Sequence, residues 1–405
     1  MKYINRTLEN YIIKLSKEYS CILLTGPRQV GKSTLLTHIS DNDKREYITL
    51  DDLNERKMAK NDPGMFFKIH SGKLLIDEVQ YAPELFSYIK IAIDKGAEPG
   101  TFFLTGSQSF KLMSIAQESL AGRIAILNLS SLSQSEISGY NNSEFIIDID
   151  ALKNREFNKL DLDDIYLRIF NGGMPALASG KYSDRELYYN SYISTFVERD
   201  VSDEIRLVDK FLFSDFIRAC ACRTSQILNI HSIASDVSVS DDTAKRWLHV
   251  LEKSNIIYFL HPLSNNLLKR TIKSPKMYFF DTGLISVLTK HSSAKVLQND
   301  SINGAILENY VINEILKSYS YVGKEPLAYY YRDVDGNEID LCLMYDNKIH
   351  PIEIKKNSSP NENMIKSFKV LENSNFNMGN GCILCFADKL SVLDKNNYII
   401  PIYYI

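Results

Sequence analysis

Short apolar runs alternate with segments of helical length over residues 19–137. Each run is bounded by Gly, Asp or Ser, and the runs cover residues 21–24, 47–50, 73–76 and 101–104. Apolar runs without polar alternation are typical of parallel strands that are covered on both faces. The pattern therefore predicts an α/β domain with a mainly parallel sheet.

The composition changes after residue 138, where a polar and acidic stretch precedes a helical tract. Further on, a small group of helices leads into a hairpin, and a later helix leads into strands at hairpin spacing. We therefore predict four parts: a first α/β domain over residues 1–138, a helical linker or lid over 139–210, a helical module with a hairpin over 211–290, and a second α/β domain over 300–405.

The first predicted strand is followed by a glycine-rich loop. Residues 26–33 read G-P-R-Q-V-G-K-S and match the P-loop pattern G-x-x-x-x-G-K-[ST] at every position. Glycine is required because the loop must turn its backbone N–H groups toward phosphates, and the helix that follows adds its positive end. We expect ATP to be bound by Gly26, Pro27, Arg28, Gln29, Val30, Gly31, Lys32, Ser33 and Thr34.

A pair of carboxylates ends the third predicted strand. In Leu74-Leu75-Ile76-Asp77-Glu78, the acids come directly after three buried apolar residues. Ligands of α/β sheets bind at the carboxyl ends of the strands, so Asp77 and the Ser33 hydroxyl are expected to hold Mg²⁺. We expect Glu78 to polarise the attacking water.

Two further groups are expected to act on the γ phosphate. Ser107 and Gln108 follow the fourth predicted strand, where either is placed to contact the phosphate or to orient water; a hydrogen-bonded loop is the alternative. Arg123 is expected to stabilise transition-state charge in the same subunit or in a neighbouring one, with a plain surface arginine as its alternative.

These motifs together resemble a family of bacterial and archaeal AAA+-type ATPases. The resemblance rests on the P-loop, on Ile76-Asp77-Glu78, on Leu104-Thr105-Gly106-Ser107 and on Leu120-Ala121-Gly122-Arg123. It continues through Gly172-Gly173-Met174-Pro175, Phe196–Asp200 and Phe280–Leu284, and so spans nearly the whole chain. The resemblance implies ATP hydrolysis and a C-terminal domain whose role is poorly defined.

The third part has the outline of a winged helix-turn-helix. Ser240 is placed to cap a helix over residues 241–254, whose apolar face is Ala244, Trp247, Leu248 and Leu251, and residues 256–260 and 277–280 are predicted wing strands. DNA phosphates are the expected partner of a basic cluster between these strands, which consists of Lys269, Arg270, Lys273 and Lys276. A lid or docking module is the alternative, because Asp241 and Asp242 repel phosphate.

The last part carries a second set of chemical groups. Glu353 and Lys355 alternate on one predicted strand and therefore share a face, Asp340 ends another strand, and Glu308 lies on a helix over residues 304–316. This set resembles the PD-(D/E)XK nuclease core. The resemblance implies a divalent cation on Asp340 and Glu353, a water beside Lys355, and Glu308 as the accessory acid; a nucleic-acid-binding or docking domain without cleavage stays open.

The bulk composition narrows the choice of partners. With 47 basic and 50 acidic residues the net charge is −3, so any DNA contact must come from a local patch. No stretch approaches the roughly 20 apolar residues of a membrane span, and six cysteines fit a reducing compartment, so a cytoplasmic location is expected. Two function hypotheses follow: an ATPase that acts on DNA in genome maintenance or defence, with further copies of the chain among its expected partners, or an ATP-controlled switch that binds protein partners.

Overall fold

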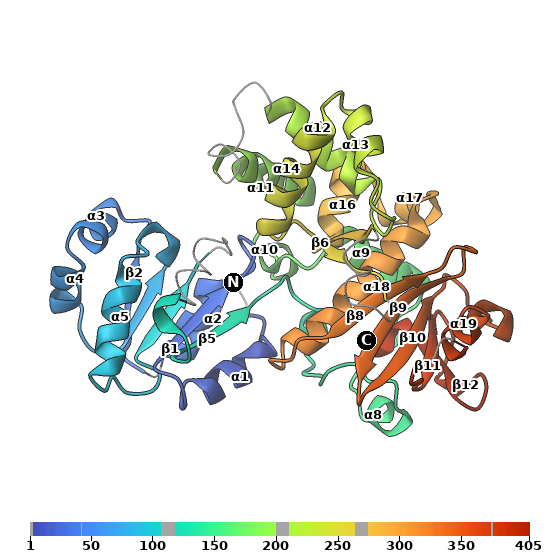
Figure 1. Cartoon of the computed structure of the whole chain (residues 1–405), viewed down its shortest axis with the longest axis horizontal. Coiled ribbons are helices and arrows are strands. Elements are labelled where there is room, and N and C mark those ends of the chain that lie inside the picture. The colour runs from blue at the N-terminus through green and yellow to red at the C-terminus, as the bar shows by residue number, and fades with distance from the viewer. Residues whose placement is uncertain (1–2, 42, 107–117, 200–209, 264–273, 374–375) are drawn as a thin grey trace.

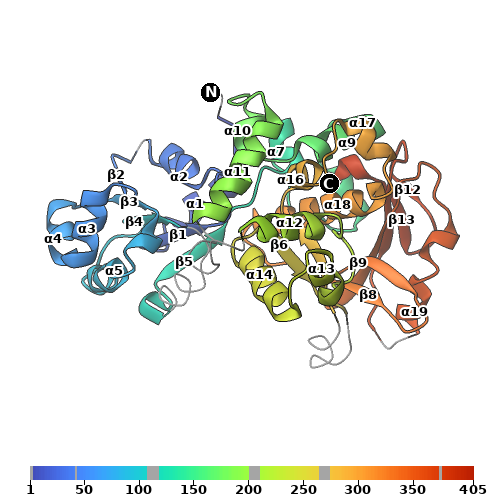
Figure 2. The same ribbon diagram turned by 90° about the horizontal axis from the view of Figure 1, so that it is seen from above.

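The computed structural model describes residues 3–41, 43–106, 118–199, 210–263, 274–373 and 376–405 of the 405-residue chain. Within these ranges, a five-stranded N-terminal sheet and a six-stranded C-terminal sheet lie on opposite sides of the molecule (Figure 1). Seen from above, helices α7 (Gln134–Ser138), α10 (Pro175–Ala178) and α11 (Arg185–Arg199) lie between the two sheets (Figure 2).

The N-terminal sheet is parallel and has the order β2-β3-β4-β1-β5. Its strands are β1 Cys21–Thr25, β2 Glu46–Thr49, β3 Leu74–Asp77, β4 Phe102–Thr105 and β5 Ile124–Asn128. The four predicted strands are therefore confirmed. The apolar pattern misses β5, an edge strand that is only partly buried.

Helices cover both faces of this sheet, so two apolar cores form on the two sides of β1. Ile22 and Leu24 pack in the core that contains Leu35 of α2, whereas Cys21 and Leu23 pack in the core that contains Phe86 of α5. The helices of this part are α1 Leu8–Leu15, α2 Lys32–Ser40, α3 Leu53–Asn61, α4 Pro63–Ile69 and α5 Leu85–Asp94. Parallel strands bring the ends of β1 and β3 to one edge of the sheet.

The middle of the described chain is largely helical. Its elements are α8 Ile149–Lys153, α9 Leu162–Asn171, α12 Lys210–Ala221, α13 Ile230–Asp236, α14 Asp241–Lys253, β6 Ile257–Leu260, β7 Lys276–Phe279, α16 Thr282–Leu288 and α17 Ala294–Asn299. Ser240 caps α14 by accepting a hydrogen bond from Thr243 N at 3.2 Å, and Ala244, Trp247, Leu248 and Leu251 are buried. The predicted cap, apolar face and antiparallel strand pair are confirmed.

The last part packs a helix against a mixed sheet of order β12-β13-β11-β10-β9-β8. Its elements are α18 Asn303–Ser320, β8 Leu327–Arg332, β9 Glu338–Tyr345, β10 Lys348–Ile354, α19 Phe368–Glu372, β11 Gly381–Cys385, β12 Ser391–Val392 and β13 Asn397–Pro401. Asp346 and Asn347 both have positive φ and form the predicted turn between β9 and β10. Neither α18 nor another helix in the described ranges has the length and apolarity needed to cross a membrane.

Candidate functional site

The loop between β1 and α2 has a shape that requires its glycines. Gly26 has φ +139°, and a Cβ at this position would lie 2.1 Å from the Leu129 carbonyl oxygen. Gly31 has φ +91° and caps the start of α2. Both values fall in the region that side chains rarely adopt, so the backbone curls in a way that another residue would obstruct. The loop therefore has the predicted P-loop curvature.

The Lys32 ammonium lies within this curve. The side chain is buried, and its Nζ donates hydrogen bonds to the carbonyl oxygens of Gly26, at 3.0 Å, and Pro27, at 2.7 Å. Both carbonyls belong to the loop itself, so the cation lies close to where phosphates would enter. A loop of backbone N–H groups, a helix N-terminus and a buried ammonium fit the charge of a triphosphate.

Three hydroxyl groups converge on the Asp77 carboxylate at the end of β3. Ser33 Oγ donates to Oδ1 at 2.6 Å, Thr105 Oγ1 donates to the same oxygen, and Tyr47 OH donates to Oδ2 at 3.0 Å. Burial and the neighbouring Asp77 charge raise the pKa of Tyr47 to about 12, which keeps its hydroxyl a donor. Asp77 therefore accepts hydrogen bonds from side chains of α2, β2 and β4.

The pairing of Ser33 with Asp77 suits magnesium. Ser33 directly follows the P-loop lysine, and its hydroxyl lies 2.6 Å from the Asp77 carboxylate. The hydroxyl can bind the cation directly, and the carboxylate can bind it through water. When bound, Mg²⁺ would neutralise charge on the β and γ phosphates. The roles of Ser33 and Asp77 as metal ligands stay predictions that this geometry fits.

Glu78 follows Asp77 and leaves the strand in a left-handed turn. Its φ is +60°, its N–H donates to Thr105 Oγ1 at 3.3 Å, and the Gln80 side-chain amide donates to its carboxylate. The turn directs Glu78 away from the path of β3 while keeping it beside Asp77. Its role as the group that polarises water stays a prediction.

Two side chains at Asp77, those of Tyr47 and Thr105, are not among the predicted site residues. Thr105 lies at the end of β4, two residues before Ser107, and Ser107 and Gln108 themselves lie outside the described residues. Strand pairing brings β4 beside β3 and so brings Thr105 to Asp77. A polar residue at the end of a buried strand is a signal for Thr105, whereas Tyr47 carries no comparable signal.

Arg123 lies at the other edge of the N-terminal sheet. It directly precedes β5, whose first residue, Ile124, pairs with Cys21 at the start of β1. The P-loop follows the opposite end of β1, about 15 Å away at roughly 3.3 Å per strand residue. Arg123 Nε instead lies 2.7 Å from Asp94 Oδ1 at the surface. Action on the nucleotide of its own chain is inconsistent with this position, and action on a neighbouring subunit stays a prediction.

A second cluster forms where β9 and β10 lie side by side. Lys355 Nζ lies 2.6 Å from Glu353 Oε2 and 3.5 Å from Asp340 Oδ2. Ile354 N also donates to Asp340 Oδ2 at 2.8 Å, and Ser367 Oγ donates to Glu353 Oε1 at 3.1 Å. The structure therefore brings together three of the four residues from the predicted second site.

Burial and charge determine the protonation of this cluster. Burial, followed by the Asp340 charge, raises the pKa of Glu353, while Lys355 opposes this shift. Burial lowers the pKa of Lys355, but the Asp340 and Glu353 charges outweigh burial and the net shift is upward. The Lys355 side chain is 37% exposed, so solvent reaches the cluster from its side.

The fourth residue, Glu308 on α18, is bonded to two side chains of β7. Its Oε1 lies 3.0 Å from Lys276 Nζ and accepts a hydrogen bond from Tyr278 OH at 2.6 Å. Burial, followed by the Asp340 charge, raises the pKa of Glu308 to about 7, while Lys276 opposes the shift. Glu308 is therefore electrostatically coupled to the cluster but already has a cation partner.

Lys276 is a correction to the predicted DNA contacts. It is 2% exposed, and its ammonium also lies 2.6 Å from Glu338 Oε1. Because the Lys276 ammonium is buried between two carboxylates, it cannot reach the phosphates of DNA. The other members of the predicted basic cluster, Lys269, Arg270 and Lys273, lie outside the described residues.

The described residues hold no group of three or more His, Cys, Asp or Glu side chains arranged to bind a metal ion. Magnesium often takes only one or two carboxylates and completes its shell with water and substrate phosphates. Asp340 and Glu353 fit that kind of site, which substrate must complete, and do not fit a metal site made by the protein alone.

Models of known protein families match three separate segments of the chain. Residues 18–138 match the family model described as an AAA domain. Residues 162–295 and 303–405 match models that are each described as a domain of unknown function (DUF8612 and DUF4143).

Relatives are similar along most of the chain. Uncharacterized proteins of Mycobacterium tuberculosis and Mycobacterium bovis are each 29% identical over 341 residues, covering 84% of this chain and 71% of theirs. Among solved structures, a Walker-type ATPase of Pyrococcus abyssi has a TM-score of 0.44 and 15% identity, covering 71% of this chain and 96% of that one. The RuvB Holliday junction branch migration motor of Thermotoga maritima has a TM-score of 0.32 and 16% identity, with 63% and 89% covered. Together, the AAA match and the geometry around Lys32, Ser33 and Asp77 show that residues 18–138 are similar to AAA-type P-loop ATPase domains.

Proposed function

We propose that the chain is a magnesium-dependent ATPase of the cytoplasm whose C-terminal part acts on DNA, in genome maintenance or in defence against mobile elements. The observation that carries the DNA role is the convergence of Asp340, Glu353 and Lys355 on adjacent strands. ATP binding and hydrolysis at the N-terminal site would then control access of DNA to this cluster.

The chemistry of the cluster suits phosphodiester hydrolysis. In such a reaction water attacks phosphorus and the bond to one ester oxygen breaks, so a negative charge develops on the phosphate. Asp340 and Glu353 would hold Mg²⁺, which stabilises that charge. Lys355, 2.6 Å from Glu353 and partly exposed, would lie beside the attacking water and orient it.

A second candidate is an ATP-controlled switch whose C-terminal part binds protein partners without cleaving DNA. One observation favours it: both cationic groups near the acids are already engaged, Lys355 by Asp340 and Glu353 and Lys276 by Glu308 and Glu338. The net charge of −3 also favours a protein partner over DNA.

The two candidates are distinguished by DNA binding and cleavage. Gel shifts with branched, single-stranded and duplex DNA, each with and without a non-hydrolysable ATP analogue, measure binding; the same DNAs with Mg²⁺ measure cleavage. Binding that depends on the analogue supports the DNA role, and added cleavage supports the nuclease. Absence of binding to all three DNAs in either nucleotide state would leave the protein-binding switch.

Arg123 is predicted to act on the nucleotide of a neighbouring subunit. Its partner Asp94 is the last residue of α5, whose Tyr88 and Ile91 side chains are also exposed. Specific ATPase activity should rise with protein concentration. Arg123→Ala should lose activity, and mixing it with Lys32→Ala should restore activity, because the second variant supplies the arginine. Turnover that is independent of concentration, with no rescue and with Lys95→Ala equally affected, would contradict this role.

The segment before β7 is predicted to contact DNA phosphates through Lys269, Arg270 and Lys273. Replacing these three residues with Gln should weaken binding to every DNA sequence alike. It should also reduce the slope of log K against log salt by up to about 0.9 for each lost phosphate contact. Lys276 is kept, since its loss would leave the buried Glu308 carboxylate without its cation. The control replaces three exposed lysines of α3 and α4, Lys57, Lys60 and Lys68, with Gln. Equal slopes in both triple variants and the parent would place the DNA contact elsewhere.

A further inference from the structure

A single buried guanidinium links the P-loop to the C-terminal part. Arg6 precedes α1 and is 5% exposed. Its Nε lies 3.2 Å from Glu136 Oε1, its Nη1 donates to the Val30 carbonyl at 3.0 Å, and its Nη2 donates to the Ser130 carbonyl at 2.7 Å and to Tyr321 OH at 3.1 Å. Val30 lies within the P-loop, whereas Tyr321 directly follows α18.

The contact to Val30 bears on the nucleotide site through the geometry of one peptide bond. The Val30 carbonyl and the Gly31 N–H belong to the same planar trans unit, so they point in opposite directions. Because Arg6 holds the carbonyl on the outer side of the loop, the Gly31 N–H is directed toward the inner side, where phosphates are expected. Arg6 thus fixes the orientation of a phosphate-binding group without touching the ligand.

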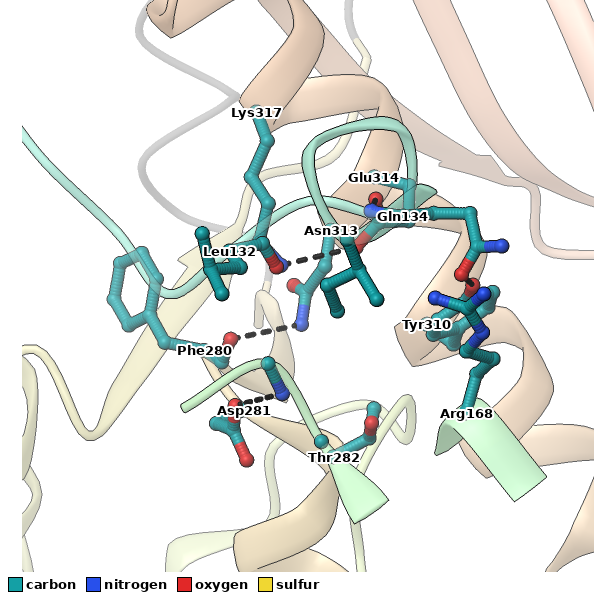
Figure 3. Close-up of a pocket in the computed structure, with 13 residues that line it drawn as sticks. Leu132, Gln134, Arg168, Phe280, Asp281, Thr282, Tyr310, Asn313, Glu314 and Lys317 are labelled. Carbon is teal, nitrogen blue, oxygen red and sulfur yellow. Dashed lines mark hydrogen bonds and ion pairs between the residues drawn. The ribbon is translucent and has the colours of Figure 1, made fainter. Parts of the chain in front are cut away.

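Side chains of helix α18 bond to residues 132–134, which belong to the segment that follows β5. Tyr310 OH donates to Gln134 Oε1 at 3.0 Å, Gln134 N donates to Glu314 Oε2 at 2.6 Å, and Lys317 Nζ donates to the Leu132 carbonyl at 3.0 Å. Figure 3 shows these side chains of α18 facing Leu132 and Gln134 across a cavity of about 20 Å³, which has room for about one water. The cavity is therefore no ligand site, and the contacts around it are structural.

The beginning of the same segment, at Leu129, contacts the P-loop. It follows β5, the neighbour of β1, and its Leu129 carbonyl lies against the Gly26 Cα. Tyr321 OH donates to the Ser131 carbonyl as well as accepting from Arg6. The P-loop is therefore packed against a segment that α18 and Tyr321 hold in place.

We propose that Arg6 and Tyr321 are positioning residues for the P-loop, so that ATP affinity depends on the docking of α18. This inference rests on ATP binding at the P-loop but not on nuclease activity. Because linkage is reciprocal, ATP would in turn stabilise the docked helix, whose earlier turn carries Glu308 of the second cluster. The C-terminal part would then regulate the ATPase and be regulated by it.

We call Arg6 and Tyr321, with their hydrogen bonds to Val30, Ser130 and Ser131, the P-loop latch. The test compares these two buried residues with two buried residues outside the latch. Arg6→Ala and Tyr321→Phe remove the latch contacts. Arg155→Ala and Tyr330→Phe are matched controls: Arg155 donates to carbonyls of Ser143, Glu144 and Tyr404, and Tyr330 of β8 donates to the Ser274 carbonyl. For each full-length variant, the Kd for a fluorescent ATP analogue and the kcat and KM for ATP are measured, together with the Tm.

We expect Arg6→Ala to raise the Kd for nucleotide about tenfold or more, because it removes a charged donor from the loop. Tyr321→Phe removes one hydroxyl and should raise the Kd severalfold with the fold intact, and Arg6→Lys should lie between parent and Arg6→Ala. The controls should lower the Tm without changing the Kd. Parent-like affinity in Tyr321→Phe and Arg6→Lys, or equal losses of affinity in the controls, would overturn the latch. A parent chain that binds no nucleotide would instead overturn the ATPase assignment on which it rests.

Discussion

Lys32→Ala is expected to abolish measurable ATP binding, whereas Glu78→Gln is expected to keep binding and lose turnover. The Lys32 ammonium is buried inside the P-loop, so its removal leaves the phosphate charge without its nearest cation. Glu78 lies beside Asp77 and holds no phosphate charge, so its amide analogue should bind ATP normally while failing to polarise water. Loss of a group that acts on the attacking water typically lowers kcat by a factor of about 100 to 10,000.

The measurement separates binding from chemistry. A fluorescent ATP analogue reports the Kd, and phosphate release reports kcat with saturating ATP and Mg²⁺. Two exposed residues of the same domain serve as matched controls, Lys68→Ala for the lost cation and Glu84→Gln for the lost carboxylate. Hydrolysis by Glu78→Gln at the parent rate would show that another group polarises the water, and unchanged affinity in Lys32→Ala would remove the ATP site from the P-loop.

The P-loop could be predicted from sequence because its determinants are contiguous. The loop depends on residues that lie close together in the sequence, namely Gly26, Gly31, Lys32 and Ser33. The backbone angles of both glycines follow from that local geometry. Asp77 was equally visible, since three apolar residues place it at a strand end. The parallel pairing of the strands then brings Asp77 to Ser33, although 44 residues separate them.

Residues whose roles depend on tertiary contacts could not be predicted from the sequence in the same way. Tyr47 reaches Asp77 from an edge strand 30 residues away, and Arg6 reaches Tyr321 across 315 residues. A lone tyrosine or arginine carries no signal of such a partner. These contacts arise from the packing of whole elements, which neither periodicity nor spacing describes.

Lys276 shows how charge patterning fails when the partner is remote. In the sequence it belongs to a basic group, which normally indicates a solvated surface. In the fold it lies at the start of β7 between Glu308 of α18 and Glu338 of β9, and both acids follow it by more than 30 residues. By contrast, the pairing of Glu353 with Lys355 was predictable, because alternation along one strand places both on one face.

Asp340→Ala is expected to remove magnesium-dependent DNA cleavage while leaving ATP hydrolysis at the parent rate. Asp340 and Glu353 both contact Lys355, and the repulsion between the two carboxylates is relieved by that ammonium, by a bound cation or by protonation of Glu353. Without Asp340, Glu353 retains Lys355 as a partner, but one carboxylate remains to hold Mg²⁺ at the DNA phosphate. Asp340 contacts Lys355 and Ile354 and none of the residues proposed to position the P-loop, so ATP hydrolysis should be unaffected.

The assay uses the full chain with 5′-labelled DNA, Mg²⁺ and ATP, and follows cleavage and phosphate release in the same reactions. Asp340→Asn keeps the shape of the side chain and should behave like the alanine variant if the charge binds the cation. Asp335→Ala, in the exposed turn between β8 and β9, is the matched control and should cleave like the parent. Cleavage that persists in Asp340→Ala would assign the activity to another site or a contaminant. A parent that binds DNA but never cleaves it would decide for a binding domain, in which Lys355 stays paired with both carboxylates instead of orienting a water.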